Sequence, residues 1–544
     1  MVRLMKQRDI RHRRAAVLIA CLCLLASSVP YLGGWAVSSD EMPFGGIILT
    51  YMEDVYTYLS AMHQGAAGSW TYQILHTPEE HQPEVLKLFY LVLGKAARVL
   101  GLSMAAAYQL ARLAAGACLL ASIYAFSGAF ADGPRSHLVA YLIGCAGGGL
   151  SWLTAVLRAA GSPWPDWMPV EFWLVESFSL PTIMIFAHGA LATAILLVTF
   201  LAVQDYRRTG TRGALAKSAA LTIALAIVQP MCLPLLGITL CVYQTLLSVR
   251  RMARGQPWLQ RTEMASIVVI GAISLPLAIF LSLPFWTNEV FRIWNQQSLT
   301  PSPSPLHLLW GYGVFVPLAV VGARRVWQDQ RDTGLLLIAW ILAAGVLLYV
   351  PGLPQRRFAQ GMIIPWGCLA ALGMEKLFRK GNDSRRSRLA YLLIVGLGVV
   401  SSTTMVARET QSILTVAEPA FHPREQLVAI EWLKNNTTHQ DTVLCGPHMG
   451  SFIPAAIGHR VFWVHWCETI DLEGKVAEFL TFFDSGTSDQ WRRTFLQQYG
   501  IKFLVYEPHG TSWGGFRPTQ APYLMERFRV GDYAVYEVTY TALP

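Results

Sequence analysis

Long apolar runs separated by polar connections fill the chain as far as residue 406. A bilayer core about 30 Å thick takes roughly 20 apolar residues per helix, so runs of about that length predict about eleven membrane-spanning helices. They cover residues 15–32, 104–130, 137–158, 179–203, 218–229, 231–247, 265–285, 306–322, 334–350, 358–374 and 389–406. Gln229 and Pro230 separate the short fifth and sixth runs, which form either a re-entrant pair or one kinked span.

The pattern changes after residue 406. Residues 424–434 (REQLVAIEWLK) and 489–499 (DQWRRTFLQQY) have the spacing of amphipathic helices, whereas 441–445 (DTVLC) and 501–506 (IKFLVY) are typical of short buried strands. Alternation of helix and strand predicts a small α/β domain over 407–544, next to a membrane domain over 1–406. No glycine-rich phosphate-binding loop supports a nucleotide site.

Composition agrees with a polytopic α-helical membrane protein. Of 544 residues, 53% are hydrophobic and 14% are charged, whereas an average soluble domain has about 25% charged residues. The net charge of +9 is spread over the short connections and does not form one basic face. We therefore expect the lipid bilayer, and no nucleic acid, as a partner.

The basic residues also predict an orientation. The N-terminal segment is basic, and every second connection is basic as well: 207–217, 250–261, 324–331 and 376–388, which includes Arg379 and Lys380. The opposite connections, 33–103, 159–178 and 286–305, are long, acidic or aromatic, and prolines after Trp286 predict an ordered loop without helix. We expect a plasma (inner) membrane protein with a cytoplasmic N-terminus and a periplasmic or extracellular domain over 407–544.

The first apolar run could be a cleaved signal peptide, because it follows a basic start. Tyr31 and Trp35 at its end suit a membrane interface better than a cleavage site. We therefore favour a retained membrane anchor.

The first external loop places Glu53 and Asp54 side by side, with His63 ten residues further along. One carboxylate could deprotonate an acceptor hydroxyl while the other binds a cation or fixes the acceptor. Together with His188, the two acids are candidate ligands for Mg²⁺ or Mn²⁺. The alternative is a solvated acidic turn.

Ionisable residues also interrupt later apolar segments. Glu176 and His188 lie near the external end of the fourth run, where a charge needs a partner or a cavity, although a core histidine bonded to a carbonyl is the simpler interpretation of His188. Arg356 and Arg357 lie on the expected external side, against the positive-inside trend. Arginine binds phosphate in a bidentate manner, so a lipid phosphate is the expected partner, with neutralisation by headgroups or carboxylates as the alternative.

In the C-terminal domain, a glycine- and aromatic-rich segment gathers four polar residues whose spacing fits no standard metal motif: His448, His459, His465 and Glu468. Packing and acceptor contacts are the favoured interpretation of this group. Of nine cysteines, Cys445 and Cys467 lie outside apolar runs and could form a disulfide in an oxidising compartment.

These segments resemble the GT-C superfamily of integral-membrane glycosyltransferases over nearly the whole chain. The likeness lies in EDVYTYLSAMHQGAAGSW, VESFSLPTIMIFAHGALA, TPSPSPLHLLWGYG, LPQRRFAQGMIIPWG and GSFIPAAIGHRVFWVHWCETIDLEGKVAEFLTFF. The chain departs from the pattern where Gln229 precedes Pro230, since histidine is expected there.

The resemblance implies transfer of a sugar from a polyprenyl-phosphate donor to a glycan, lipid or protein acceptor at the outer membrane face. Asp54, with Glu53 beside it, would be the active-site acid of the first external loop, and the match of Glu176 and His188 is looser. Arg356 and Arg357 would meet the leaving phosphate, and the region between His63 and Arg98 would line the acceptor approach. A transporter and a non-catalytic envelope or polysaccharide assembly protein are the competing classes.

Overall fold

A computed structural model of the chain describes residues 2–162, 167–378 and 385–540. Residues 163–166 of the expected loop 159–178, and Arg379 and Lys380 of the last basic connection, lie outside the described residues. The chain divides into two compact units. Unit 1 comprises Met1–Pro30, Leu110–Phe280 and Leu299–Thr410, and unit 2 comprises Tyr31–Gln109, Leu281–Ser298 and Gln411–Pro544.

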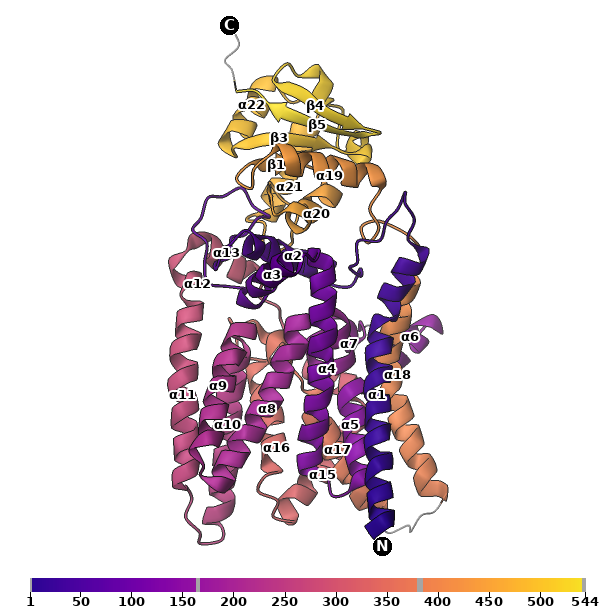
Figure 1. The fold of residues 1–544 in the computed structure, drawn as a ribbon, viewed down its shortest axis with the longest axis vertical. Helices are drawn as coiled ribbons and strands as arrows, with labels where there is room; N and C mark the ends of the chain where they lie inside the picture. Colours follow the sequence, from indigo (N-terminus) through magenta and orange to yellow (C-terminus); the bar gives the residue numbers. More distant parts are fainter. Residues whose placement is uncertain (1, 163–166, 379–384, 541–544) are drawn as a thin grey trace. The chain divides into compact units, whose positions relative to one another are not determined.

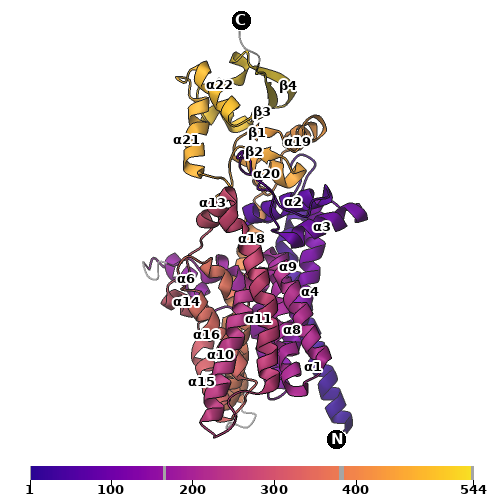
Figure 2. The same ribbon diagram turned by 90° about the vertical axis from the view of Figure 1, so that its left-hand side faces the viewer.

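Unit 1 is helical, and in both views its long helices run in roughly one direction (Figures 1 and 2). Four helices continue from one unit into the other: α1 (Val2–Val37), α4 (Met104–Phe130), α11 (Arg261–Ser282) and α18 (Arg385–Ile413). The others are α5 (Pro134–Ala146), α6 (Ser151–Ala159), α7 (Ser179–Ile185), α8 (Ala187–Thr209), α9 (Arg212–Val228), α10 (Cys232–Met252), α14 (Pro305–Tyr312), α15 (Phe315–Gln328), α16 (Leu335–Leu347) and α17 (Ile363–Phe378). Three short 3₁₀ turns join them: η1 (Val170–Phe172), η2 (Val175–Ser177) and η3 (Gln355–Ala359).

Each predicted span corresponds to helix, and the chain is a multi-pass membrane protein. Within the described residues, seven helices are long and apolar enough to cross a bilayer, or nine if each of two bent pairs is one span. The pairs are α5 with α6, bent by 55°, and α14 with α15, bent by 86°. Since α9 has 17 residues and α16 has 13, a count of about eleven crossings stays a prediction.

Two expected spans are broken where the backbone cannot continue as helix. The span 137–158 stops at Gly147–Gly149, and 306–322 stops at Gly313, whose φ is +49°. A Cβ on Gly149 would lie 2.2 Å from the carbonyl oxygen of Gly311, so the two bent pairs approach through glycine backbone. The span expected over 179–203 begins instead at Ala187, because Phe186 is extended and separates α7 from α8.

Glycine also sets the packing of α15 against α17. A Cβ on Gly322 would lie 1.9 Å from the Leu369 oxygen, and one on Gly373 would lie 2.0 Å from the Leu318 oxygen. Small residues that let helix backbones meet are typical of packing inside membranes, where the hydrophobic effect does not drive association.

Unit 2 contains helices in two of the long connections between the predicted spans. The first loop, 33–103, includes α2 (Met52–Ala66) and α3 (Leu88–Leu100), which cross closely at Gly65 and Gly94. The prediction that residues after Trp286 lack helix was wrong, because the prolines begin only at Pro301. The chain forms α12 (Pro284–Thr287) and α13 (Glu289–Gln297) before them.

The remainder of unit 2 is the small α/β domain expected from the sequence (Figure 2). Its strands are β1 (Thr442–Leu444), β2 (Arg460–Val461), β3 (Ile501–Tyr506), β4 (Leu524–Val530) and β5 (Tyr533–Val538), in the order β2-β1-β3-β5-β4. The first three are parallel, whereas β5 pairs antiparallel with β3 and β4. Its helices are α19 (Arg424–Asn436), α20 (Pro447–Ile457), α21 (Leu472–Phe483) and α22 (Asp489–Gln498), with 3₁₀ turns η4 (Pro508–Ser512) and η5 (Pro518–Gln520).

Alternate side chains of the strands fill two separate cores. Phe503 and Val505 pack with α19 and α20, whereas Leu504 packs with the aromatic residues of α21 and α22. Successive side chains of a strand point to opposite faces, so the sheet is the middle of three layers. The predicted helices 424–434 and 489–499 and strands 441–445 and 501–506 are confirmed as α19, α22, β1 and β3.

Candidate functional site

Glu53 and Asp54, in the long connection 33–103, lie in the first turn of α2. Tyr51, in the left-handed conformation with φ 59°, turns the chain into this helix. The positive end of the helix dipole favours carboxylates here. Glu53 is exposed and Asp54 is half-buried. Neighbouring protein that displaces water raises the pKa of Glu53, and the nearby His76 opposes this shift.

A buried carboxylate, Glu468, stands at the centre of a polar network in the same unit. Its side chain is 1% exposed. Lys87 Nζ donates to Oε1 at 2.6 Å, the Tyr72 hydroxyl donates at 2.9 Å and 3.0 Å, and His76 Nδ1 lies 3.0 Å from Oε2. Burial raises the pKa of Glu468, but Lys87 and His76 outweigh it and hold the pKa well below its usual range. The group is therefore an ionised carboxylate inside the protein.

The network reaches the acidic turn of α2. Thr57 Oγ1 accepts from Lys87 Nζ at 2.7 Å and donates to the Asp54 carbonyl oxygen at 2.9 Å. The Asp54 charge also raises the pKa of Cys467, after the larger effect of burial. Lys87 and Thr57 thus connect the backbone of the candidate base to Glu468.

His465 packs beside this network as a neutral ring. Its Nδ1 accepts from the backbone N–H groups of Cys467 and Glu468 at 3.3 Å and 3.1 Å, and burial lowers its pKa to about 3. These contacts are those of packing residues, and contact of His465 and Glu468 with the acceptor stays a prediction. The partners of Glu468 could not be predicted from the sequence, because they precede it by almost four hundred residues. An acid within the aromatic segment VHWCET was the one available signal.

His63 lies at the far end of α2 from Glu53. Ten helical residues rise about 15 Å. His63 packs against Gly458 and hydrogen-bonds the backbone of Ala455, and burial lowers its pKa to about 4. These contacts explain His63 as a packing residue between α2 and α20.

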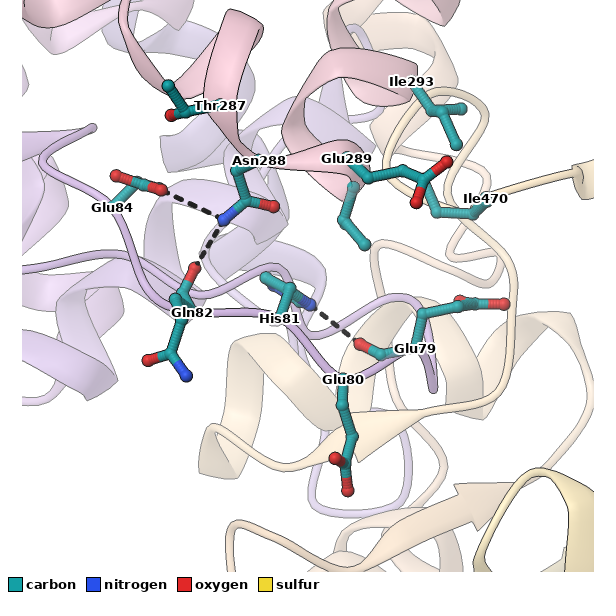
Figure 3. A pocket seen from close by; sticks show the side chains of 11 residues that line it. Glu79, Glu80, His81, Gln82, Glu84, Thr287, Asn288, Glu289, Ile293 and Ile470 are labelled. Carbon is teal, nitrogen blue, oxygen red and sulfur yellow. Dashed lines mark hydrogen bonds between the residues drawn. The ribbon is translucent and has the colours of Figure 1, made fainter.

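A cavity of about 650 Å³ opens in unit 2 beside the segment that precedes α3 (Figure 3). Carboxylates dominate its polar lining: Glu79, Glu80, Glu84 and Glu289. Asn288 Nδ2 donates to Glu84 Oε1 and to the Gln82 carbonyl oxygen, both at 3.0 Å, and holds one wall in place (Figure 3). Such a lining accepts hydrogen bonds from hydroxyl groups and attracts cations.

In unit 1, the structure brings the arginine segment next to Glu176 and the start of α8. Arg356 Nη1 donates to the Trp173 carbonyl oxygen at 3.2 Å, and its guanidinium lies 5.5 Å from the Trp173 ring centre. The Gly361 N–H donates to the Glu176 carbonyl oxygen at 2.8 Å, and Gln360 donates to Gly189, the neighbour of His188. Arg356, Arg357, Glu176 and His188 therefore belong to one region of unit 1.

The structure groups candidate metal ligands in the C-terminal domain and leaves two thiols unbridged. Among the described residues, the converging group of three metal-binding side chains is Glu418, His448 and His509. Glu53, Asp54 and His188 are not in it, so cation binding by these residues stays a prediction. Cys445 and Cys467 are both buried free thiols.

Comparison with known proteins identifies the fold. No protein-family model and no curated protein sequence matches the chain. The solved structure of the oligosaccharyltransferase AglB from Archaeoglobus fulgidus, in complex with an inhibitory peptide and a dolichol-phosphate, is similar over 91% of this chain and 69% of that chain. Its TM-score is 0.54 and its identity 11%.

Two further transferase structures are similar. The mycobacterial arabinofuranosyltransferase AftD matches 97% of this chain and 42% of that chain, with a TM-score of 0.53 and 14% identity. The structure of ArnT from Cupriavidus metallidurans bound to undecaprenyl phosphate matches 97% of this chain and 99% of that chain, with a TM-score of 0.49 and 14% identity. The chain has the fold of the GT-C integral-membrane glycosyltransferases, as its sequence resemblance indicated.

Proposed function

We propose that this protein is a glycosyltransferase that moves a sugar from a polyprenyl-phosphate donor to an acceptor at the outer face of the membrane. The observation that carries the proposal is the GT-C fold over 91% of the chain, combined with two adjacent carboxylates in the first turn of α2. The dolichol-phosphate and peptide in the AglB structure support a lipid-linked donor and a separate acceptor. A lipid-phosphate donor also needs no nucleotide-binding loop.

In the proposed reaction, Asp54 takes the proton from the acceptor hydroxyl while that oxygen attacks the anomeric carbon of the sugar. The bond between the anomeric carbon and the phosphate oxygen breaks, and the phosphate leaves with the bonding electrons. Arg356 and Arg357 stabilise its charge. Glu53 fixes the acceptor or binds a divalent cation, Mg²⁺ or Mn²⁺.

Glu176 and His188 are positioning residues in this scheme. The carbonyl of Glu176 and the start of α8 hold the segment that carries the arginines. In the proposed orientation, the N-terminus is cytoplasmic and residues 407–544 are periplasmic or extracellular. The connection 33–103, which carries the proposed base Asp54, is then on the outer side as well.

Native mass spectrometry of the detergent-purified protein tests the donor. We expect a co-purified polyprenyl-phosphate sugar, and we expect proteoliposomes supplied with that lipid to release free polyprenyl phosphate only when an acceptor is present. A transporter would move the lipid or sugar without breaking the glycosidic bond. An assembly protein would bind partners without consuming the donor, so either result would refute the transferase.

A further inference from the structure

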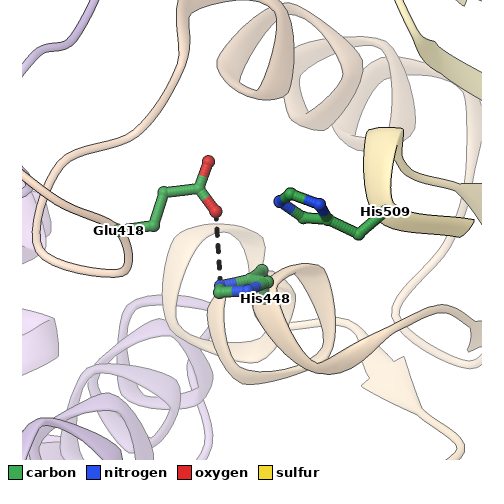
Figure 4. Close-up of side chains that lie close together, drawn as sticks. All are labelled: Glu418, His448 and His509. Carbon is green, nitrogen blue, oxygen red and sulfur yellow. Dashed lines mark ion pairs between the residues drawn. The ribbon is translucent and has the colours of Figure 1, made fainter. Parts of the chain in front are cut away.

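Two histidines and a glutamate meet where three segments of the α/β domain come together (Figure 4). Glu418 belongs to the segment between α18 and α19, His448 to the first turn of α20, and His509 to η4. Their candidate ligand atoms all lie within 4.8 Å of one another. His448 Nδ1 lies 3.3 Å from Glu418 Oε2, and the two imidazole centres are 5.9 Å apart.

This donor set suits a transition-metal ion. Imidazoles favour zinc, copper or nickel over magnesium and calcium, which prefer oxygen ligands. Zinc with two histidines and one carboxylate is a common three-ligand arrangement that leaves a fourth position for water. Tetrahedral bonds of 2.0–2.2 Å place ligand atoms about 3.4 Å apart. Glu418 and His448 already meet that spacing, and the exposed His509 is free of close packing on its outer side.

An independent feature beside the cluster is a buried polar atom without a hydrogen-bond partner among the described residues. Glu507, two residues before His509, is 1% exposed. Its Oε1 has no hydrogen-bond partner within the described part of the chain, and its carboxyl interacts electrostatically with Glu418. A buried oxygen without a hydrogen-bond partner calls for a bound water or ion nearby, and the cluster lies beside it.

We infer that the α/β domain binds one zinc-class divalent ion through Glu418, His448 and His509. The ion links three parts of the domain: the segment between α18 and α19, helix α20, and η4. It thereby closes a loop of the chain from residue 418 to residue 509. Metal binding to a folded site stabilises the folded state. The ion therefore stabilises the packing of the segment around Glu418 against the α/β domain. The site is independent of the proposed transfer reaction.

The test measures zinc uptake by the full-length protein in detergent. After chelator treatment, the protein is incubated with zinc chloride, freed of unbound metal, and analysed for metal by mass spectrometry and for thermal unfolding. We expect one zinc per chain and a higher unfolding temperature. Replacing one ligand should weaken binding roughly 100-fold or more, because even residues that only support a ligand contribute 10- to 100-fold.

The variants separate this site from other binding and from misfolding. His509→Asn changes an exposed side chain and should remove zinc without loss of folded protein, and a His448→Ala variant should do the same. His439→Ala is the matched control, since His439 contacts Gly458 at the opposite end of α20. A combined Glu53→Gln and Asp54→Asn variant should keep its zinc. Absence of uptake by the parent, or undiminished uptake by a folded His448→Ala, His509→Asn double variant, would overturn the assignment.

Discussion

Lys87 Nζ lies 2.6 Å from Glu468 Oε1, although 381 residues separate them in the chain. The lysine side chain is 12% exposed and the glutamate 1% exposed, so neither charge can be solvated well without the other. The pair connects the segment before α3 to the segment before α21. The pair therefore tests whether the segment 33–103 and the α/β domain fold as one body in unit 2.

Lys87→Met should destabilise unit 2 by about 3–5 kcal/mol, because it leaves an uncompensated buried carboxylate. Thermal unfolding followed by tryptophan fluorescence measures the change. Lys434→Met, which removes a lysine of α19 that is 58% exposed, should change stability by less than about 1 kcal/mol. Equal losses in the two variants would show that the Lys87–Glu468 pair has no special weight.

The parts of the fold that depend on local periodicity could be predicted from the sequence. Apolar runs located every long helix, and the patterns of 424–434 and 501–506 located α19 and β3. The breaks in the predicted spans at Phe186 and Gly313 were not predicted, because the backbone conformation of a single residue causes each of them. The edge strand β4 was missed because charged residues such as Glu526 and Arg529 lie among its apolar ones on a half-exposed edge. The mostly buried strand β5 was also not predicted.

The candidate sites were harder to predict because they depend on contacts that are distant in the chain. Glu53 and Asp54 are neighbours in the sequence, so their proximity could be predicted. The network around Glu468 could not, because Tyr72, His76 and Lys87 approach it only in the folded chain. His63 and Glu53 both belong to α2, but they lie at opposite ends of this helix. His448 and Glu418 carried no spacing signal, since metal motifs are recognised by short, fixed separations.

Acid should weaken unit 2 through its buried histidines. Burial lowers the pKa of His63 to about 4, from a usual value of 6.5, and burial lowers that of His465 to about 3. Between about pH 6.5 and 4 the unfolded chain binds more protons than the folded chain, so stability falls as the pH falls. We expect the unfolding temperature to drop steadily from pH 7 to pH 5, and His63→Gln to reduce that slope. An unchanged slope would show that His63 is solvated.

Replacing both arginines of η3, Arg356→Gln with Arg357→Gln, should weaken donor binding more than folding. Each charge-assisted bond to phosphate is worth about 1.5–3 kcal/mol, so the double variant should bind polyprenyl phosphate at least tenfold more weakly. Binding is measured by native mass spectrometry, with Arg324→Gln, an exposed arginine of α15, as the control. Unaltered lipid binding in the double variant would remove the arginines from the phosphate site.

The orientation can be tested with single cysteines. Ser512→Cys in η4 should react with a membrane-impermeant maleimide in intact cells, because residues 407–544 are expected outside. Gln256→Cys, in the connection between α10 and α11, should react only after the membrane is opened. Both positions are exposed in the structure, so protection reflects the membrane and not burial. The reverse pattern would invert the topology.

Asp54→Asn is the decisive change for the enzymatic proposal. The substitution keeps the size of the side chain and its place in the first turn of α2, but removes the carboxylate that accepts the proton. Proton transfer by a positioned group contributes about 100- to 10,000-fold, so turnover should fall by that factor while donor binding and unfolding temperature stay near the parent values.

Two companion variants make the Asp54 result interpretable. Asp532→Asn alters an exposed acid in the turn between β4 and β5 and should leave turnover unchanged. Glu53→Gln should have a smaller effect than Asp54→Asn if Glu53 holds the acceptor or a cation. The rate of Asp54→Asn should also lose the dependence on pH that titration of the base gives the parent. Full activity of Asp54→Asn in proteoliposomes would exclude Asp54 as the base, and full activity of the Glu53→Gln, Asp54→Asn double variant would exclude general-base catalysis from this turn altogether.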